Sequence, residues 1–302
     1  MRVLLIAGGW SKEREVSLSG AIQIRDALHD LGHEVRLLDL SPDYQVLVDE
    51  ARHAEAAFIN LHGHPGEDGL IQALLEDVGL PYQGSGPKGS FMALNKALSK
   101  RIYSNHGLPV PRGRLYVGAC IQFVPDQVPV VCKPNLGGSS LDMDIFHDPE
   151  ELGKYLENLH PQEEVLLEEY IPGTEISCAV LEDTALPPIL IKPRKRDFFD
   201  YQSKYDPDGA VEICPAPVSP EITEQIKKFA LTAHNVLGLR HYSRTDFMLD
   251  AQDNIYTLET NTLPGMTRTS LVPKAASQAG LEFSDLISRL LFLARTSKTS
   301  RG

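Results

Sequence analysis

The sequence contains no apolar run that approaches the roughly 18 residues needed to span a bilayer. The apolar stretch at its N-terminus is short and meets charged residues from Lys12 onward, which argues against a signal peptide. Basic residues are also scarce, since 29 Lys and Arg stand against 41 Asp and Glu, a net charge of −12. Phosphate backbones require a basic face, so we expect neither a nucleic-acid nor a membrane partner. A small anionic ligand in a local pocket remains compatible with this charge.

Cysteine is rare too, and the four cysteines show neither close pairs nor the spacing of a metal site. Cys132 and Cys178 lie within apolar runs, which favours buried free thiols and a reducing, cytoplasmic location. Internal repeats and low-complexity tracts are absent from the sequence. The composition, 42% hydrophobic and 23% charged, is that of a globular protein with a full core. A chain of 302 residues allows two or three domains.

The first third of the chain alternates strand and helix patterns. A continuous apolar run predicts a strand at residues 3–7, and the next strands are predicted at 35–40 and 56–61. Apolar residues at helical spacing predict a helix over 16–31, with Gly32 as its C-terminal cap. This order predicts a doubly wound parallel sheet, in which ligands bind at the carboxyl ends of the strands. We assign this α/β unit to residues 1–88.

Two loops, residues 8–15 and 62–69, follow strands of this predicted sheet. A nicotinamide site is disfavoured, because the third glycine of the dinucleotide pattern is missing and two acidic residues would repel a pyrophosphate. Glu15 has two interpretations: a surface residue stabilised by the helix dipole, or a group that holds a ligand ammonium. From this loop alone the surface interpretation is favoured.

Beyond residue 85 the pattern changes to an α+β type. A helix is predicted over 91–106, and strands are predicted at 128–133, 165–169 and 175–181. We divide this part into a central unit, residues 89–181, and a C-terminal unit, residues 182–302.

Lys133 ends one of these strands and precedes a loop of glycines and serines. Such a loop offers backbone N–H groups and hydroxyls to phosphate oxygens, while the lysine supplies positive charge. The alternative interpretation of this loop is a flexible turn. Lys96, in the predicted helix before it, could also supply positive charge, and its alternative interpretation is a solvated surface lysine. Further on, Glu168 and Glu169 end an apolar strand, and Glu175 follows a proline–glycine break. The backbone from Glu169 to Ile171 suits the edge of a purine and Glu175 suits ribose hydroxyls, unless these acids are simply solvated.

The segments around Asp246 and Glu259 predict an antiparallel hairpin with a turn near Gln252. Glu259 and Asn261 are two residues apart and share a face, and Asp246 lies near them across the ladder. Two carboxylates and an amide oxygen are the hard ligands that magnesium prefers. A solvated sheet face is the alternative, but the intervening residues are apolar, which favours a buried metal site. The charged, aromatic segment 192–214 is long enough to form a lid.

Together these motifs resemble the D-alanine–D-alanine ligases, a family of the ATP-grasp superfamily. The matching segments run in one order along nearly the whole chain, and the last of them is specific to this family. They are EREVSL (13–18), HG and GEDG (62–63, 66–69), GSG (84–86), KP (133–134), GSS (138–140), KY (204–205), CPA (214–216), RTD (244–246), ETN (259–261), PGMT (264–267) and SLVP (270–273).

The resemblance implies a two-part ATP-grasp fold after the N-terminal domain, with ATP between the two parts. It implies two magnesium ions, for which manganese is an alternative, held by Asp246, Glu259 and Asn261. The implied nucleotide ligands are Lys96, Lys133, Glu168, Glu169, Ile171 and Glu175. It also implies a homodimer.

For the substrates, the resemblance implies that Glu15 binds the ammonium group of the first D-alanine, with His62 nearby. Ser139 and Tyr205 would link to Glu15 and close the lid. Lys204, Ser270 and Leu271 would bind the second D-alanine. Arg244 and the Gly265 N–H would face the reacting oxygen.

The implied activity is the ATP-dependent ligation of two D-alanines, through an acyl phosphate, to the D-Ala-D-Ala unit used in peptidoglycan. Tyr205 favours this dipeptide over a depsipeptide product. Two residues depart from the family pattern: Ser243 stands where glycine is usual, and Leu141-Asp142 follows the serines where Val-Gly is usual. The alternatives are a ligase for other D-amino or hydroxy acids and a nucleotide-binding regulatory protein without turnover.

Overall fold

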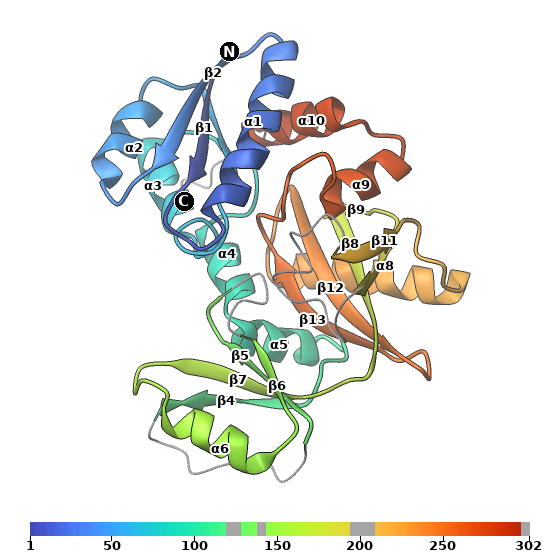
Figure 1. Ribbon diagram of the computed structural model, residues 1–302. Coiled ribbons are helices and arrows are strands. Elements are labelled where there is room, and N and C mark those ends of the chain that lie inside the picture. The colour runs from blue at the N-terminus through green and yellow to red at the C-terminus, as the bar shows by residue number, and fades with distance from the viewer. Residues whose placement is uncertain (119–127, 138–142, 194–208, 297–302) are drawn as a thin grey trace.

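The computed structural model describes residues 1–118, 128–137, 143–193 and 209–296, which form three sheets with flanking helices (Figure 1). In the N-terminal sheet, β1 (Arg2–Gly8) lies between β2 (Glu34–Leu40) and β3 (Ala56–Ile59), and all three are parallel. β1 is buried from Val3 to Gly8, because helices cover a parallel sheet on both faces. The predicted parallel sheet is therefore confirmed. The helices of this region are α1 (Arg14–Asp30), α2 (Tyr44–Ala51) and α3 (Leu70–Val78).

The helix predicted over 91–106 is in fact two helices, α4 (Pro87–Leu94) and α5 (Lys96–Asn105). Asn95 between them has an extended backbone with ψ 98°, and its side chain accepts a hydrogen bond from the Leu98 N–H at 3.0 Å. An N-cap of this kind starts a new helix with a new direction. The break places Lys96 in the first turn of α5.

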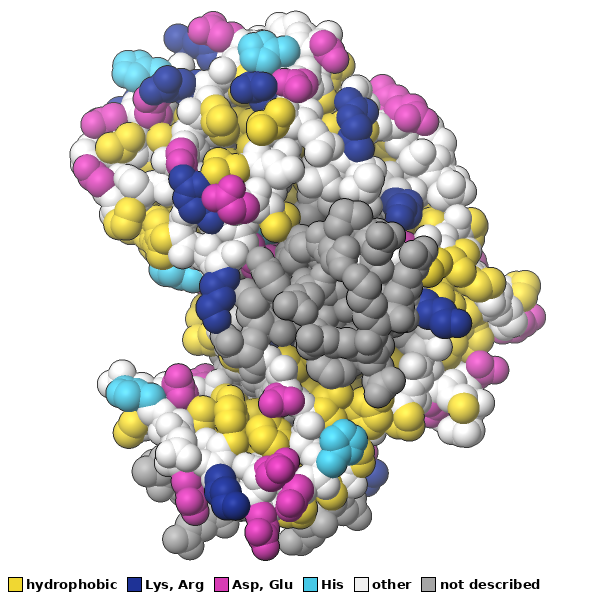
Figure 2. All heavy atoms as spheres, viewed as in Figure 1, with side chains coloured by type: hydrophobic (Ala, Val, Ile, Leu, Met, Phe, Trp, Pro, Cys, Tyr) yellow, Lys and Arg dark blue, Asp and Glu magenta, His cyan; other side chains and the backbone are white. Residues whose placement is uncertain are grey.

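The central sheet is antiparallel, with strand order β4-β7-β5-β6. Helix α6 (Pro149–Glu157) packs on it through Leu152 and Leu156. Sheet and helix form the lower lobe in Figure 1, and in the same view the surface is hollowed between this lobe and the rest of the molecule (Figure 2). The strands are β4 (Gly113–Val117), β5 (Val130–Pro134), β6 (Asp144–Phe146) and β7 (Glu164–Glu169).

The C-terminal sheet has the strand order β11-β10-β8-β12-β13, with β9 paired to β8. Strand β8 pairs with β12 along its whole length, from Gly173 opposite Asp250 to Leu181 opposite Tyr242. The expected boundary at residues 181 and 182 therefore does not follow the sheets, because β8 belongs to the later one. The strands are β8 (Gly173–Leu181), β9 (Thr184–Ala185), β10 (Ile189–Pro193), β11 (Ala210–Ile213), β12 (Tyr242–Asp250) and β13 (Ile255–Asn261).

Three further helices complete the described chain: α8 (Pro220–Val236), α9 (Leu271–Gln278) and α10 (Phe283–Thr296). Helix α8 packs on β8 and β12, whereas α10 returns to the N-terminal domain and contacts α1 and β3 (Figure 1). One hydrophobic core consequently joins β1 and β3 with α9 and α10. Cys132 and Cys178 are buried free thiols, as predicted. Among the helices of the described ranges, none has both the length and the apolar character needed to cross a membrane.

The departure at Ser243 has a structural partner. Its hydroxyl lies 2.8 Å from Nδ1 of His234 on α8, and both residues are buried. Burial lowers the pKa of His234 to about 4, so this ring is neutral near pH 7. The serine thus supplies the hydrogen-bond partner that a buried neutral imidazole requires.

Candidate active site

The hairpin of β12 and β13 brings the predicted metal ligands together. Asp246 pairs with Glu259, and Arg244 pairs with Asn261. Phe247 then pairs with Thr257, so Leu258 is the extra residue of a β-bulge. The bulge changes the alternation of β13, leaving both Leu258 and Glu259 half-buried. Asp246, Glu259 and Asn261 therefore lie beside one another, as the sequence predicts.

The Asp246 carboxylate is buried and accepts hydrogen bonds from three side chains. Arg244 donates two of them, from Nε at 2.9 Å and Nη2 at 2.7 Å. Ser177 Oγ donates at 2.7 Å and Asn261 Nδ2 at 3.1 Å. Burial opposes the positive charge of Arg244, but the adjacent carboxylate outweighs it and raises the pKa of the guanidinium. The guanidinium of Arg244 consequently keeps its charge inside the protein.

Lys96 lies at the same site, so the surface interpretation of this residue is wrong. It is 6% exposed, its ammonium group donates to the Gly137 carbonyl oxygen, and its Nζ lies 3.4 Å from Glu259 Oε2. Asn135 connects the two segments, because its carbonyl oxygen accepts from the Lys96 N–H at 3.1 Å and its Oδ1 from the Ala97 N–H at 2.9 Å. The start of α5 is thereby fixed to the loop that follows β5.

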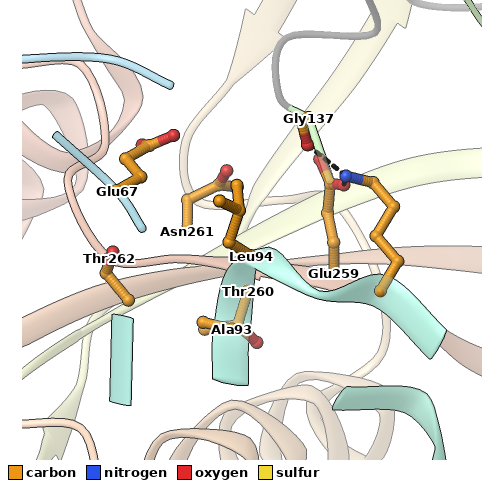
Figure 3. Close-up of a pocket in the computed structure, with 9 residues that line it drawn as sticks. Glu67, Ala93, Leu94, Gly137, Glu259, Thr260, Asn261 and Thr262 are labelled. Carbon is orange, nitrogen blue, oxygen red and sulfur yellow. Dashed lines mark hydrogen bonds and ion pairs between the residues drawn. The ribbon is translucent and has the colours of Figure 1, made fainter. Parts of the chain in front are cut away.

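A small pocket, partly open to solvent, lies between these elements. Figure 3 shows Glu67 on one side of it and Asn261 and Glu259 of β13 on the other, with Gly137 at the upper right. Carboxylate and amide oxygens face a buried lysine here, an arrangement that suits a cation and a phosphate side by side. The complete lining is Glu67, Ala93, Leu94, Lys96, Gly137, Glu259, Thr260, Asn261 and Thr262.

A second buried cluster involves the predicted nucleotide ligands Lys133 and Glu168. Lys133 Nζ lies 2.6 Å from Glu168 Oε2, and Lys100 Nζ lies 2.5 Å from Glu168 Oε1. The side chain of Glu168 is only 2% exposed, and the two lysines lower the pKa of its carboxyl group against the effect of burial. The sequence analysis missed Lys100, although its spacing of four from Lys96 on one helix is a signal for a shared face.

Glu169 points away from this cluster, because successive side chains of a strand alternate between faces. Its carboxylate accepts from Arg112, at 2.8 Å from the backbone N–H and at 3.1 Å from Nε. Of the other expected nucleotide ligands, Ile171 is half-buried after β7, and Glu175 lies on β8 opposite Met248. The charge of Glu175 acts on both Lys133 and Arg244.

Glu168→Ala is expected to lower the free energy of unfolding by about 3–5 kcal/mol, because it leaves two buried ammonium groups without their counter-ion. Glu169→Ala is the matched control: its partner Arg112 is exposed, so the expected loss is below about 1 kcal/mol. Urea unfolding of both variants measures the difference. Equal losses of unfolding free energy in the two variants would contradict the conclusion that the buried cluster stabilises the fold.

The structure places Glu15 of the N-terminal domain at the surface. The Glu15 side chain is 90% exposed, and its Oε1 lies 3.9 Å from Arg14 Nη1. Glu13, by contrast, is 4% exposed, precedes α1 directly, and exerts its charge on His62 and Glu67. Two residues correspond to roughly 200° around a helix axis, so the two carboxylates point in nearly opposite directions. The buried carboxylate of this loop is therefore Glu13.

His62 and Glu67 flank Glu13 from the loop after β3. His62 Nδ1 lies 3.2 Å from the Leu263 carbonyl oxygen, and burial lowers the pKa of this imidazole. Glu67 Oε2 accepts from the Gly63 N–H at 2.9 Å. Burial, followed by the charge of Glu13, raises the pKa of Glu67 to about 8. The sequence analysis quoted Glu67 within a motif but assigned it no role.

The raised pKa of Glu67 predicts a pH-dependent stability. In the unfolded chain this carboxyl titrates near its usual value of about 4.5, whereas in the folded protein it keeps its proton up to about pH 8. Its contribution to stability is therefore complete below pH 4.5 and is lost as the pH rises toward 8. Unfolding of the wild type and of Glu67→Gln, measured from pH 5 to 9, is expected to show a steeper decline in the wild type. If the unfolding free energies of the two proteins changed with pH in parallel, the raised pKa of Glu67 would be contradicted.

Gly265 and Ser270 meet at the start of α9. A Cβ atom at Gly265 would lie 3.1 Å from Ser270 Oγ, which also accepts from the Thr267 N–H at 3.1 Å. Leu271, the first residue of α9, is half-buried. Ser139, Lys204, Tyr205 and the Leu141-Asp142 departure lie outside the described residues, as does most of the expected lid.

The fold combines an N-terminal parallel sheet with two later antiparallel sheets, and the site combines buried lysines with paired carboxylates. Together they define an ATP-grasp ligase. Residues 123–292 match the family described as "D-ala D-ala ligase C-terminus". The D-alanine–D-alanine ligase of Maridesulfovibrio salexigens is 50% identical over 302 residues, covering 99% of this chain and 100% of the relative. That of Nitratidesulfovibrio vulgaris strain DP4 is 51% identical over 300 residues, covering 98% and 99%. This chain belongs to the D-alanine–D-alanine ligase family.

The solved structures agree. The Bacillus anthracis D-alanine–D-alanine ligase complexed with ATP superposes with a TM-score of 0.87 at 31% identity, covering 100% of both chains. A second structure of the B. anthracis ligase gives a TM-score of 0.89 at 33% identity, again over 100% of both chains. The expected fold, a doubly wound domain followed by an ATP-grasp fold, is confirmed.

Proposed function

We propose that this protein joins two D-alanine molecules to D-alanyl-D-alanine, with ATP as the energy source, for peptidoglycan precursor synthesis. One observation carries the proposal for this chain: Asp246 and Glu259 pair across a hairpin beside the buried lysine Lys96. That group combines cation ligands with a phosphate-binding charge in one pocket. Membership of the family supplies the identity of the two amino acids.

The oxygen donors of the hairpin fit two magnesium ions, with manganese as an alternative. Asp246 and Glu259 would hold one ion, and Glu259 with Asn261 the other. Each carboxylate oxygen of Asp246 already accepts two hydrogen bonds, from Arg244, Ser177 and Asn261, so a cation at Asp246 would replace one or more of them. When bound, the ions would offset negative charge on the transferring phosphoryl group.

The nucleotide would lie between the central and C-terminal sheets. Lys96 and Lys133 would contact its phosphates, Glu168 its adenine amino group, and Glu175 its ribose. The backbone of Glu169 to Ile171 would meet the purine edge, since the Glu169 side chain faces Arg112. We also propose three functional units that follow the sheets, namely residues 1–88, 89–172 and 173–302.

For the first D-alanine, we assign the ammonium group to Glu13 in place of Glu15, because Glu13 is the buried carboxylate beside His62. Ser270 and Leu271 would contact the second D-alanine, together with Lys204. Ser139 and Tyr205 would close the lid over the Glu13 loop. A homodimer is the expected assembly.

The residue types suit the chemistry. A carboxylate resists attack by an amine, so phosphoryl transfer from ATP first converts it to an acyl phosphate. The second amine then attacks, and Arg244 with the Gly265 N–H would stabilise the oxyanion that develops. Arg244 is suited to this role because Asp246 fixes its orientation with two hydrogen bonds. Water must be excluded, because it would hydrolyse the acyl phosphate.

A coupled assay for ADP release with D-alanine, D-lactate and D-serine tests the proposal. We expect rapid release with D-alanine alone, and a dipeptide product by mass spectrometry. Faster turnover with a D-alanine and D-lactate mixture would identify a depsipeptide ligase instead. ATP binding without ADP release would support a regulatory protein.

A further inference from the structure

The buried cluster around Glu168 contains one lysine more than the proposed reaction uses. Glu168 comes from β7, Lys133 from β5 and Lys100 from α5, so three elements each contribute one charge. All three residues are buried: Glu168 is 3% exposed, Lys100 6% and Lys133 8%. Two positive charges facing one negative charge leave the cluster with a net positive charge. The carboxylates of Glu259 and Glu175 act on this excess charge, Glu259 on both lysines and Glu175 on Lys133.

The two lysines differ in what surrounds them. Lys133 stands near the end of β5, where the charges of Glu259 and Glu175 both act on it. Lys100 also contacts β13, because its Nζ donates to the Thr257 carbonyl oxygen at 3.5 Å. Its helix is fixed to the same strand by the hydrogen bond from Tyr103 to Thr260 Oγ1, at 2.7 Å. Lys133 is therefore placed to exchange partners, and Lys100 is not.

We propose that Lys100 is the permanent counter-ion of Glu168 and a positioning residue for nucleotide selection. When Lys133 turns to the phosphates of the nucleotide, Lys100 alone keeps the Glu168 carboxylate ionised. An ionised carboxylate only accepts hydrogen bonds, so it accepts from the 6-amino group of adenine and repels the 6-oxo group of hypoxanthine or guanine. Lys100 thus sets the preference for an adenine nucleotide without touching it. This inference rests on the proposed contact of Glu168 with adenine.

Without Lys100, a bound nucleotide would leave Glu168 buried and uncompensated. A carboxyl group in that situation takes up a proton. The protonated form donates a hydrogen bond, which a 6-oxo purine accepts. Removal of the Lys100 charge is therefore expected to weaken the binding of ATP. The preference of the enzyme for ATP over inosine triphosphate should fall as a result.

The test compares kcat/KM for ATP and for inosine triphosphate, which has a 6-oxo group in place of the 6-amino group, with saturating D-alanine and magnesium. Lys100→Met is expected to lower the ATP to ITP ratio at least tenfold, mainly through KM for ATP. Lys100→Arg retains the charge and is expected to restore most of the preference. Arg101→Met, at the exposed neighbouring position of the same helix, is the matched control and should keep the wild-type ratio.

A Lys100→Met enzyme whose ATP to ITP ratio equals that of the wild type would overturn the inference, even if its overall activity were lower. The Glu168→Gln background provides a second measurement that does not depend on the stability of the single variant. A glutamine carries no charge to compensate, so adding Lys100→Met there should leave the ratio unchanged, and a further tenfold fall would also overturn the inference. A wild-type protein that releases no ADP with D-alanine would contradict the proposed function itself.

Discussion

Glu259→Gln is expected to lower turnover by roughly a thousandfold. In the proposed site this carboxylate serves both cations and contacts Lys96, so one substitution weakens both cations and the placement of one phosphate-binding lysine. Charge stabilisation by bound metal ions contributes several kcal/mol, and about 1.4 kcal/mol corresponds to a factor of ten in rate. Folding should persist, since the amide has the shape of the carboxylate.

Steady-state ADP release over a magnesium titration measures this effect. Glu157→Gln, at an exposed position of α6, is the control for loss of one negative charge and should retain wild-type activity. If Glu259→Gln unfolds at a temperature close to that of the wild type, the loss of turnover arises in the reaction and not from unfolding. Near-normal turnover in saturating magnesium would refute the metal assignment.

The second large effect separates two neighbouring carboxylates. Glu13→Gln is expected to reduce kcat/KM for D-alanine by at least about 100-fold, because a buried carboxylate paired with a substrate ammonium group contributes about 2–5 kcal/mol. Glu15→Gln is expected to remain within about twofold of the wild type, because its side chain is 90% exposed and a surface charge in water contributes little.

Initial rates as a function of D-alanine concentration, with ATP saturating, distinguish the two variants. The pair is well matched, since both substitutions remove one charge from the same loop and helix start. A loss at Glu15 with normal activity at Glu13 would restore the assignment made from the sequence.

Local patterns predicted several features correctly. The apolar run of β1, the helical spacing of α1 and the Gly32 cap depend on neighbouring residues alone, and each lies where it was expected. The hairpin of Asp246 and Glu259 was also predictable, because a short turn brings its strands together at a known spacing. The family relationship was predictable as well, because short local motifs in a characteristic order indicate it.

Local patterns failed where a residue's surroundings come from distant parts of the chain. Glu13 and Glu15 are equivalent as sequence letters, and only the packing of α1 against the His62 loop buries one and exposes the other. Strand β8 looked like a continuation of the central unit, yet its hydrogen bonds go to β12, more than sixty residues later. The local pattern around Lys96 left a surface position open, and only the loop after β5, distant in sequence, buries this lysine.

The sequence by itself determined the class of fold, the hairpin that pairs Asp246 with Glu259, and the family, because these depend on short-range periodicity and on motif order. Only the tertiary structure decided which charges are buried together. Lys100, Lys133 and Glu168 belong to three elements, and no spacing along the chain indicates that their side chains meet within 2.6 Å. Burial makes such a cluster strongly coupled, since low dielectric strengthens each interaction and penalises each unpaired charge. Electrostatic roles at this site therefore follow from three-dimensional packing, which the order of residues does not contain.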